Sequence, residues 1–424
     1  MPPLLTMAHL TPLHQARRTL LELLRAALDA VNGQQAVASR LSARGIEGPV
    51  VVLALGKASQ SMVAGARAVL GERLVRGLVI SKPGHLDRDL LAGWGLEVVE
   101  AGHPVPTEAS LTAGRRLLGL IEGVQSGETL LALISGGASS LAEASACGLT
   151  LPDLQRANRW LLGSGLSITE VNWVRKALSA IKGGGLLRWL GGGPVRALAI
   201  SDVPGDDPSS IGSGLLVPQP DLAERLSGLD LPDWLRRWVD AGLAERGPAA
   251  AEGPPIEVVA NLEVAKSAAA AAARARGLAV RVHAEFVAGD AAVRGRDLAE
   301  DLLAGASGVH VWGGETTVRL PPEPGRGGRN QHLALAAATV LAGHGGGCLL
   351  SAGTDGTDGP TEDAGALVDG GTLQRALDAG ADAQTALKAA DAGTLLEATG
   401  DLVHTGPTGT NVMDLILGYR FGDR

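Results

Sequence analysis

The residues VVVLALGK (50–57) indicate the fold class, because an unbroken apolar run stops abruptly at a glycine and a lysine. Three further runs are mostly apolar, and each is followed directly by a serine: 77–80, 129–134 and 195–200. Apolar runs that do not alternate with polar residues are typical of strands that helices cover on both faces. These four runs therefore predict a mostly parallel sheet.

Helical segments are expected between the strands, and this alternation of strand and helix predicts a Rossmann-like α/β domain. The expected helices are Leu10–Ala30, Ser59–Leu70, Thr107–Ile121, Leu151–Leu162 and Ile168–Ala180. Thr107 follows a proline and is a good candidate for the N-cap of its helix.

A second alternating region begins after Gly247–Pro255, whose prolines, glycines and alanines indicate a linker between domains. The expected strands of this region are Ile256–Val259, Ala279–Ala284, Gly308–Trp312 and Gly347–Ser351, with a helix at Glu263–Arg276. We therefore expect two α/β domains, residues 1–246 and 256–424.

The composition argues against several classes of protein. The net charge is −8 and no basic tract stands out, so neither nucleic acid nor an anionic membrane surface is an expected partner. Hydrophobic residues make up 45% of the chain, which is typical of a globular protein, and no apolar stretch predicts a membrane span. Neither Cys147 nor Cys348 has a neighbouring cysteine, and the N-terminus does not have the pattern of a signal peptide. We therefore expect a cytoplasmic protein.

Three common cofactor motifs are missing from the sequence. Gly56 and Lys57 are followed by Ala58, so the P-loop pattern of nucleotide-binding proteins is absent. No G-x-G-x-x-G opens a helix after a strand, which argues against a nicotinamide cofactor. Neither H-E-x-x-H nor paired cysteines predict a zinc site.

Polar residues gather where the predicted strands end, and parallel α/β sheets bind ligands at the carboxyl ends of their strands. Lys57 follows the first strand and can face a phosphate or a carboxylate, unless it is a solvated lysine at a helix start. The turn Ser135-Gly136-Gly137 can bind an oxyanion through backbone N–H groups, although an ordinary strand–helix turn is the alternative. Asp202 and Asp206 follow another strand and can hold Mg²⁺ or accept a hydroxyl proton, unless they are solvated turn residues.

Asn172 and Arg175 are three residues apart, so on a helix their side chains lie on one face. An amide and a guanidinium together suit a hydroxyacid that carries one carboxylate. The alternative is a surface helix with mixed charges.

The second half of the chain carries further polar loops. Glu315 ends a predicted strand, and Gly327-Gly328-Arg329-Asn330 precedes an apolar helix, a position suited to a polyphosphate. Asp355 and Asp358 can share a divalent ion. The candidate ligands of an oxyanion or a ribose in the last loop are Thr405, Thr408, Thr410 and Asn411.

Taken together, these loops resemble those of the MOFRL-type glycerate kinases, also called class II glycerate 2-kinases. The matching stretches follow one another along nearly the whole chain: Leu55–Ala58, Ile134–Gly137, Asn172–Lys176, Ser201–Asp206, Gly313–Thr317, Gly327–Gln331, Gly353–Pro360 and Thr405–Asn411. Each stretch is a weak signal by itself, and the order of all eight makes the resemblance specific.

The resemblance implies ATP-dependent phosphorylation of D-glycerate to 2-phosphoglycerate, with Mg²⁺ as the divalent metal. It implies two α/β domains with the active site in a cleft between them, at which the last residues of the chain pack back. Lys57 and Arg329 match the catalytic lysine and arginine of the family. Asp202 is then the candidate that orients or deprotonates the hydroxyl of glycerate, and the candidate metal ligands are Asp206, Asp355 and Asp358.

The chain departs from the family pattern at several positions, among them Ala138, Ala177 and Met413, and these changes leave the preferred acceptor open. The alternatives are a kinase for another small hydroxyacid, an NAD(P)H-dependent hydroxypyruvate reductase, and a non-catalytic protein that binds a phosphorylated sugar acid. Monomer and homodimer are both open.

Overall fold

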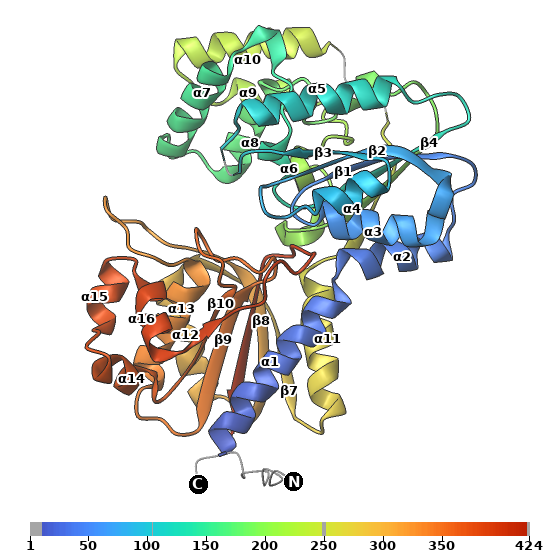
Figure 1. Ribbon diagram of the computed structural model, residues 1–424. Coiled ribbons are helices and arrows are strands. Elements are labelled where there is room, and N and C mark those ends of the chain that lie inside the picture. The colour runs from blue at the N-terminus through green and yellow to red at the C-terminus, as the bar shows by residue number, and fades with distance from the viewer. Residues whose placement is uncertain (1–10, 104, 248–251, 422–424) are drawn as a thin grey trace. The chain divides into compact units, whose positions relative to one another are not determined.

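The computed structural model describes residues 11–103, 105–247 and 252–421 (Figure 1). The chain divides into two compact units. The parallel-sheet unit comprises residues 32–261 and 409–411. The mixed-sheet unit comprises the described residues before 32, residues 262–408, and the described residues from 412 onward.

The parallel-sheet unit contains six strands that all run parallel, in the order β3-β2-β1-β4-β5-β6. This order is that of the doubly wound Rossmann sheet, in which the chain changes direction between β1 and β4. The predicted Rossmann-like sheet is thus confirmed. The strands are β1 (Val50–Leu55), β2 (Leu74–Ser81), β3 (Leu96–Glu100), β4 (Thr129–Ile134), β5 (Val195–Ile200) and β6 (Ile256–Ala260).

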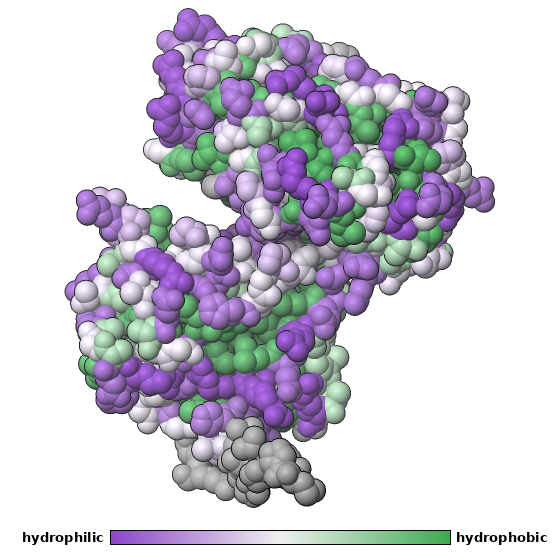
Figure 2. Space-filling view, viewed as in Figure 1, coloured by the Kyte–Doolittle hydropathy of each residue, from purple (hydrophilic) through white to green (hydrophobic). Residues whose placement is uncertain are grey.

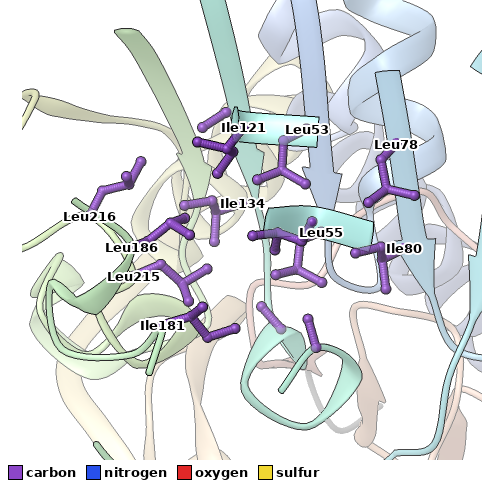
Figure 3. Close-up of a cluster of buried hydrophobic side chains, with 14 of the residues drawn as sticks. Leu53, Leu55, Leu78, Ile80, Ile121, Ile134, Ile181, Leu186, Leu215 and Leu216 are labelled. Atoms are coloured by element: carbon purple, nitrogen blue, oxygen red, sulfur yellow. The ribbon is translucent and has the colours of Figure 1, made fainter. Parts of the chain in front are cut away.

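Helices cover both faces of this sheet, which explains why every residue of β1 and β4 is buried. Helix α3 packs on β1 and β2 from one side, and α5 packs on β2 and β3 from the other (Figure 1). Figure 3 shows Leu53, Leu55 and Ile134 gathered with Ile121 of α5 in one apolar cluster. The helices of this unit are α2 (Gly33–Ala43), α3 (Ser59–Leu70), α4 (Arg88–Gly93), α5 (Glu108–Glu122), α6 (Ala138–Leu141), α7 (Leu151–Gly163), α8 (Ile168–Ala177), α9 (Leu222–Ser227) and α10 (Asp233–Arg246).

The mixed-sheet unit also contains a six-stranded sheet, in the order β11-β10-β9-β12-β8-β7. Only β7 and β8 pair in parallel among these described strands, and the other pairs are antiparallel. The strands are β7 (Val280–Asp290), β8 (Gly308–Thr317), β9 (Gly347–Gly353), β10 (Gly365–Asp369), β11 (Leu402–Val403) and β12 (Asp414–Arg420).

Two layers of helices enclose this second sheet. Helices α1 and α11 pack together and contact β12, and α13 contacts β9 and β10 (Figure 1). The helices are α1 (Pro12–Ala30), α11 (Leu262–Ala275), α12 (Ala291–Ala304), α13 (Arg329–Leu341), α14 (Thr372–Asp378), α15 (Ala383–Lys388) and α16 (Ala392–Thr399). Within the described residues, no helix combines the length and the apolar character that crossing a bilayer requires.

The division of the chain differs from the expected boundary at 246–256 in two respects. Strand β6, expected to open the second domain, pairs in parallel with β5 and completes the first sheet. Helix α1, expected in the first domain, belongs to the mixed-sheet unit because its buried stripe packs on α11, β9 and β12. Residues 248–251 of the expected linker lie outside the described residues.

Hydrophilic and hydrophobic residues both reach the surface of each unit on the face shown in Figure 2. Most large apolar side chains with high exposure are isolated along the chain. Leu162 and Ile168 are the most exposed of those described, and they flank the short connection between α7 and α8. Single exposed apolar side chains are normal on a protein surface.

Candidate active site

The carboxyl ends of β1 and β4 hold the first cluster of predicted residues. The backbone N–H of Lys57 donates to the carbonyl of Gly136 at 2.9 Å, and the N–H of Ala58 donates to Ser135 Oγ at 3.0 Å. The position is the one at which a doubly wound sheet binds ligands, because the connections leave β1 and β4 in opposite directions there. Lys57 is thus fixed beside the predicted Ser135-Gly136-Gly137 turn.

Side chains close on this turn from three sides. A Cβ on Gly136 would overlap Asp202 Oδ2 and Asn411 Nδ2, so only glycine allows their close approach. Asn411 Nδ2 donates to Asp202 Oδ2 at 3.1 Å. Lys57 Cγ lies 3.3 Å from the position that a Cβ on Gly137 would take. The structure therefore brings together five predicted positions: Lys57, Gly136, Gly137, Asp202 and Asn411.

A pocket of about 190 Å³ adjoins the same turn. Gly137, Ser139 and Ser140 form one part of its lining, and α7 and α8 form another. Arg175 of α8 lines the pocket, and its Nε donates to Asn158 Oδ1 of α7 at 2.9 Å. Burial lowers the pKa of Arg175, and the attraction of Glu143 offsets part of this effect.

Asn172, predicted to act with Arg175, is not among the described residues that line this pocket. The amide partner of Arg175 is instead Asn158, from the neighbouring helix. Sequence reasoning missed Asn158, because the pairing of two helices leaves no mark in the local pattern. It also gave no role to Glu143, which forms an ion pair with Lys182 in the same lining.

Asp206 lies in a short turn after β5 and accepts a hydrogen bond from Asn261 Nδ2 at 2.5 Å. In the mixed-sheet unit, Asp355 Oδ1 accepts from the N–H and the hydroxyl of Thr357, both at 3.0 Å. No group of three or more His, Cys, Asp or Glu side chains suited to a metal ion occurs in the part of the chain that is described. Mg²⁺ needs fewer protein ligands, because it commonly keeps several waters and takes one or two carboxylates besides substrate phosphates.

Arg329 begins α13, and its guanidinium is held by two carboxylates. Its Nε and Nη2 bond Asp414 Oδ2 and Oδ1 at 2.6 and 2.9 Å, and Nη1 lies 3.1 Å from Glu315 Oε1. Burial by itself lowers the pKa of Arg329, but the attraction and hydrogen bonds of Asp414, with the attraction of Glu315, raise it overall. Arg329 therefore keeps its charge, and the paired contact with Asp414 fixes the plane of its guanidinium.

Asp358 caps the same helix from within the protein. Its oxygens accept the backbone N–H groups of Asn330 and Gln331 at 3.0 and 2.8 Å. Burial raises the pKa of Asp358 to about 7, and the two N–H bonds oppose this shift. A Cβ on Gly328 would overlap this carboxyl group. A fully buried carboxyl that already accepts two N–H bonds is poorly suited to the predicted metal role.

The side chain of Asn330 is also held by hydrogen bonds inside the protein. Its side chain is buried, donates to Asp358 Oδ1 at 3.3 Å and accepts from Ser351 Oγ at 2.6 Å. The amide of Asn330 is therefore already bonded within the protein, and the neighbouring residues of the loop are better candidates for binding phosphate. Gly327, Gly328 and Arg329 line a pocket of about 330 Å³.

Two of the predicted threonines of the last loop donate their hydroxyls to backbone carbonyl groups. Thr408 Oγ1 donates to the carbonyl of Thr354 at 2.5 Å, and Thr405 Oγ1 donates to the carbonyl of Gly406 at 2.9 Å. Thr410 is buried. The loop leads to Asn411 in the first cluster and to Asp414 beside Arg329. No motif predicts the contact between Asp414 and Arg329.

Two family descriptions match this chain. Residues 19–230 match a domain of unknown function, DUF4147, and residues 308–414 match the MOFRL family. A protein of Agrobacterium vitis with the provisional name hydroxypyruvate reductase is 39% identical over 417 residues. That match covers 94% of this chain and 93% of the relative.

The D-glycerate 2-kinase of Thermotoga maritima is 35% identical over 416 residues, which cover 95% of this chain and 98% of the enzyme. The crystal structure of glycerate kinase from the same organism superimposes with a TM-score of 0.82 at 35% identity. The superposition covers 96% of this chain and 99% of the other. The resemblance of the eight loops is confirmed, and the chain belongs to the glycerate kinase family.

Proposed function

We propose that this protein is a glycerate 2-kinase, which transfers the γ-phosphoryl group of ATP to the hydroxyl on carbon 2 of D-glycerate. The observation that carries the proposal is the cluster at the ends of β1 and β4, where Lys57, the Ser135–Gly137 turn, Asp202 and Asn411 meet. It contains a cation, backbone donors and a carboxylate. These are the groups that bind a phosphoryl group and orient a hydroxyl.

Lys57 has the role of neutralising charge on the transferring phosphoryl group. Phosphoryl transfer requires little covalent chemistry from the protein, so positioning and charge neutralisation supply most of the rate. The backbone bond to Gly136 fixes the base of the Lys57 side chain, and its Cγ lies beside the open face of Gly137, so the orientations of its ammonium group are limited.

Asp202 has the role of accepting or orienting the acceptor hydroxyl. One of its oxygens accepts from Asn411 at 3.1 Å, which orients the carboxylate over Gly136. The side chain is partly exposed, so a hydroxyl can reach it from solution. Arg175, in the adjoining pocket, is suited to the carboxylate of the acid.

Arg329 has the role of a second catalytic cation. Asp414 is almost fully buried and binds the guanidinium through two bonds, whereas Glu315 forms an ion pair with it and is 44% exposed. A phosphate can replace the weaker Glu315 contact while Asp414 keeps the guanidinium in place. The loop at Gly327 and Gly328 supplies the adjoining pocket for the rest of a nucleotide.

Mg²⁺ would supply charge neutralisation between the phosphate groups of ATP. Asp202 and Asp206 follow β5 as a pair of partly exposed carboxylates, and Asp355 is a separate, buried candidate in the mixed-sheet unit. One or two such carboxylates would be enough to hold Mg²⁺, because substrate phosphates and water would supply its other ligands.

The test is an assay with ATP, Mg²⁺ and D-glycerate, in which ADP is followed by coupling and the product is identified by phosphorus NMR. ADP together with 2-phosphoglycerate is the expected result. Formation of 3-phosphoglycerate would overturn the site of transfer, and no ADP from folded protein would overturn the kinase. A parallel reaction with NADH and hydroxypyruvate is expected to show no change in absorbance.

A further inference from the structure

Arg175 is a largely buried cation without an acidic partner. Its Nε is bound to the amide oxygen of Asn158, and no carboxylate within the described ranges forms an ion pair with its guanidinium. A buried charge is costly unless another charge compensates it. The guanidinium faces a pocket, so the missing counterion is one that enters from solution.

Glu143 is an acidic residue of the pocket lining that could form an ion pair with Arg175 in place of a ligand. It lines the same pocket, and its charge already acts on Arg175. Its Oε2, however, forms an ion pair with Lys182 Nζ, and its Oε1 accepts a hydrogen bond from Ser179 Oγ at 2.6 Å. The side chains of Lys182 and Glu143 are only 4% and 5% exposed. Both oxygens of Glu143 are thus already bound by buried partners within the protein.

Arg246 fixes the backbone that carries Lys182. Its Nη1 donates to the carbonyl oxygens of Lys176, Ser179 and Lys182 at 2.9, 3.2 and 2.8 Å. Burial lowers the pKa of Arg246 to about 10, which leaves it charged at neutral pH. The backbone at Lys182 is therefore fixed, and the Lys182 side chain holds Glu143 in place.

We propose that Arg175 binds the carboxylate of the acceptor in this pocket, and that Lys182 is a positioning residue that keeps the pocket open by holding Glu143 away from Arg175. The proposal rests on the proposed function for the identity of the acceptor. It explains why one pocket contains two cations and one acid: the Lys182–Glu143 pair is internally neutral, and Arg175 supplies the charge for the ligand.

The position of the pocket is consistent with phosphoryl transfer to a 2-hydroxyacid. Gly137 belongs both to the pocket lining and to the turn against which Lys57 Cγ lies. A small acid whose carboxylate is bound to Arg175 therefore has its carbon chain beside the turn that carries the proposed catalytic groups. A 2-hydroxyacid fits this arrangement, because its hydroxyl is one carbon away from the carboxylate.

The experiment measures D-glycerate binding by isothermal titration calorimetry, without ATP, for the wild type and three variants. Lys182→Met releases Glu143, which can then pair with Arg175, and we expect binding to weaken about 30-fold or more. Lys182→Met combined with Glu143→Gln removes the competing charge, and we expect affinity within about fivefold of the wild type, because a neutral replacement of a buried ion pair is often tolerated. Glu143→Gln alone is expected to bind at least as well as the wild type.

Methyl D-glycerate, which has no carboxylate, is the control ligand, and we expect it to bind none of the four proteins measurably. Unchanged affinity of Lys182→Met, or failure of the double variant to recover, would overturn the role of Lys182. Equal binding of the methyl ester and the acid would overturn the carboxylate site. Circular dichroism spectra compare the folds of the variants, and recovery in the double variant cannot come from a merely structural defect.

Steady-state kinetics separates this proposal from the proposed function. If the wild type forms 2-phosphoglycerate and Lys182→Met raises KM while kcat changes little, both stand. If the wild type transfers phosphate and the KM of Lys182→Met is unchanged, only the role of Lys182 fails. If the wild type binds D-glycerate with the expected variant pattern but transfers no phosphate, the carboxylate site stands and the kinase activity fails.

Discussion

Arg175 in the parallel-sheet unit and Arg329 in the mixed-sheet unit are both candidate ligands of an anion, but their surroundings differ. Arg329 is bound by Asp414 and Glu315, whereas Arg175 is bound by the neutral amide of Asn158. The pKa of Arg329 is raised by its acids, and burial lowers the pKa of Arg175. The charge of Arg329 is compensated within the protein, and its acids hold the guanidinium in one orientation for the reaction. The charge of Arg175 is not compensated by an ion pair among the described residues, so we expect Arg175 to attract an anionic ligand more strongly.

Lys57→Met tests the cluster at the ends of β1 and β4 and has the largest expected effect. Loss of a cation that neutralises the transferring group is expected to lower kcat at least about 100-fold, by analogy with the loss of one donor from a preorganised site. The measurement is the coupled ADP assay at saturating ATP and D-glycerate. The matched control is Lys388→Met on the exposed surface of α15, which is expected to keep wild-type turnover. Turnover near the wild-type value in Lys57→Met would remove Lys57 from the mechanism.

Arg329→Met tests the neutralised arginine and is expected to affect both rate and stability. We expect kcat to fall at least about tenfold, because an arginine at a transferring phosphoryl group stabilises its charge. The free energy of unfolding is expected to fall by about 2 kcal/mol, a value reduced for the partial exposure of Arg329, because Asp414 is left buried without a partner.

Urea denaturation measures the stability of Arg329→Met, and the ADP assay measures its turnover. Arg319→Met, an exposed residue after β8, is the control for the loss of an arginine. A variant with lowered turnover but unchanged stability would show that Asp414 does not depend on this ion pair.

Much of the parallel-sheet unit could be predicted from the sequence, because buried parallel strands are continuous apolar runs and their carboxyl ends meet at one edge. Lys57, the Ser135–Gly137 turn and Asp202 were found by this rule. The assignment of β6 could not be predicted, because an apolar strand after a linker carries no mark of the sheet it joins. The partners Asn158 and Asp414 could not be predicted either, because each meets its arginine through tertiary packing.

Asp358 is a buried acid whose ionisation makes the stability of the protein depend on pH. Its folded pKa, about 7, lies above the unfolded value near 3.8, so its contribution to stability is present at low pH and is lost as pH rises through 7. Between pH 6 and 8 we expect the wild type to lose about 1 kcal/mol relative to Asp358→Asn. Urea denaturation at a series of pH values measures this difference.

The control for this titration is Asp382→Asn, which removes the charge of the exposed N-cap residue of α15 and keeps a side-chain oxygen for the cap. Hydrogen bonds from Thr385 lower the pKa of Asp382, so both its folded and unfolded forms are ionised between pH 6 and 8. The stability difference between this variant and the wild type is therefore expected to stay constant over that range. The same constancy in Asp358→Asn would contradict the raised pKa.

Arg175→Met completes the contrast with Arg329, because its expected effect on stability is smaller than that of Arg329→Met and of opposite sign. Removing a buried cation that has no acidic partner relieves its desolvation, so we expect the free energy of unfolding to rise by about 1 kcal/mol. D-Glycerate binding is expected to be lost at the same time, because the ligand then has no guanidinium to bind. A stability loss like that of Arg329→Met would show that Arg175 is neutralised within the protein. Stability and function therefore oppose each other at Arg175, whereas at Arg329 the same ion pair serves both.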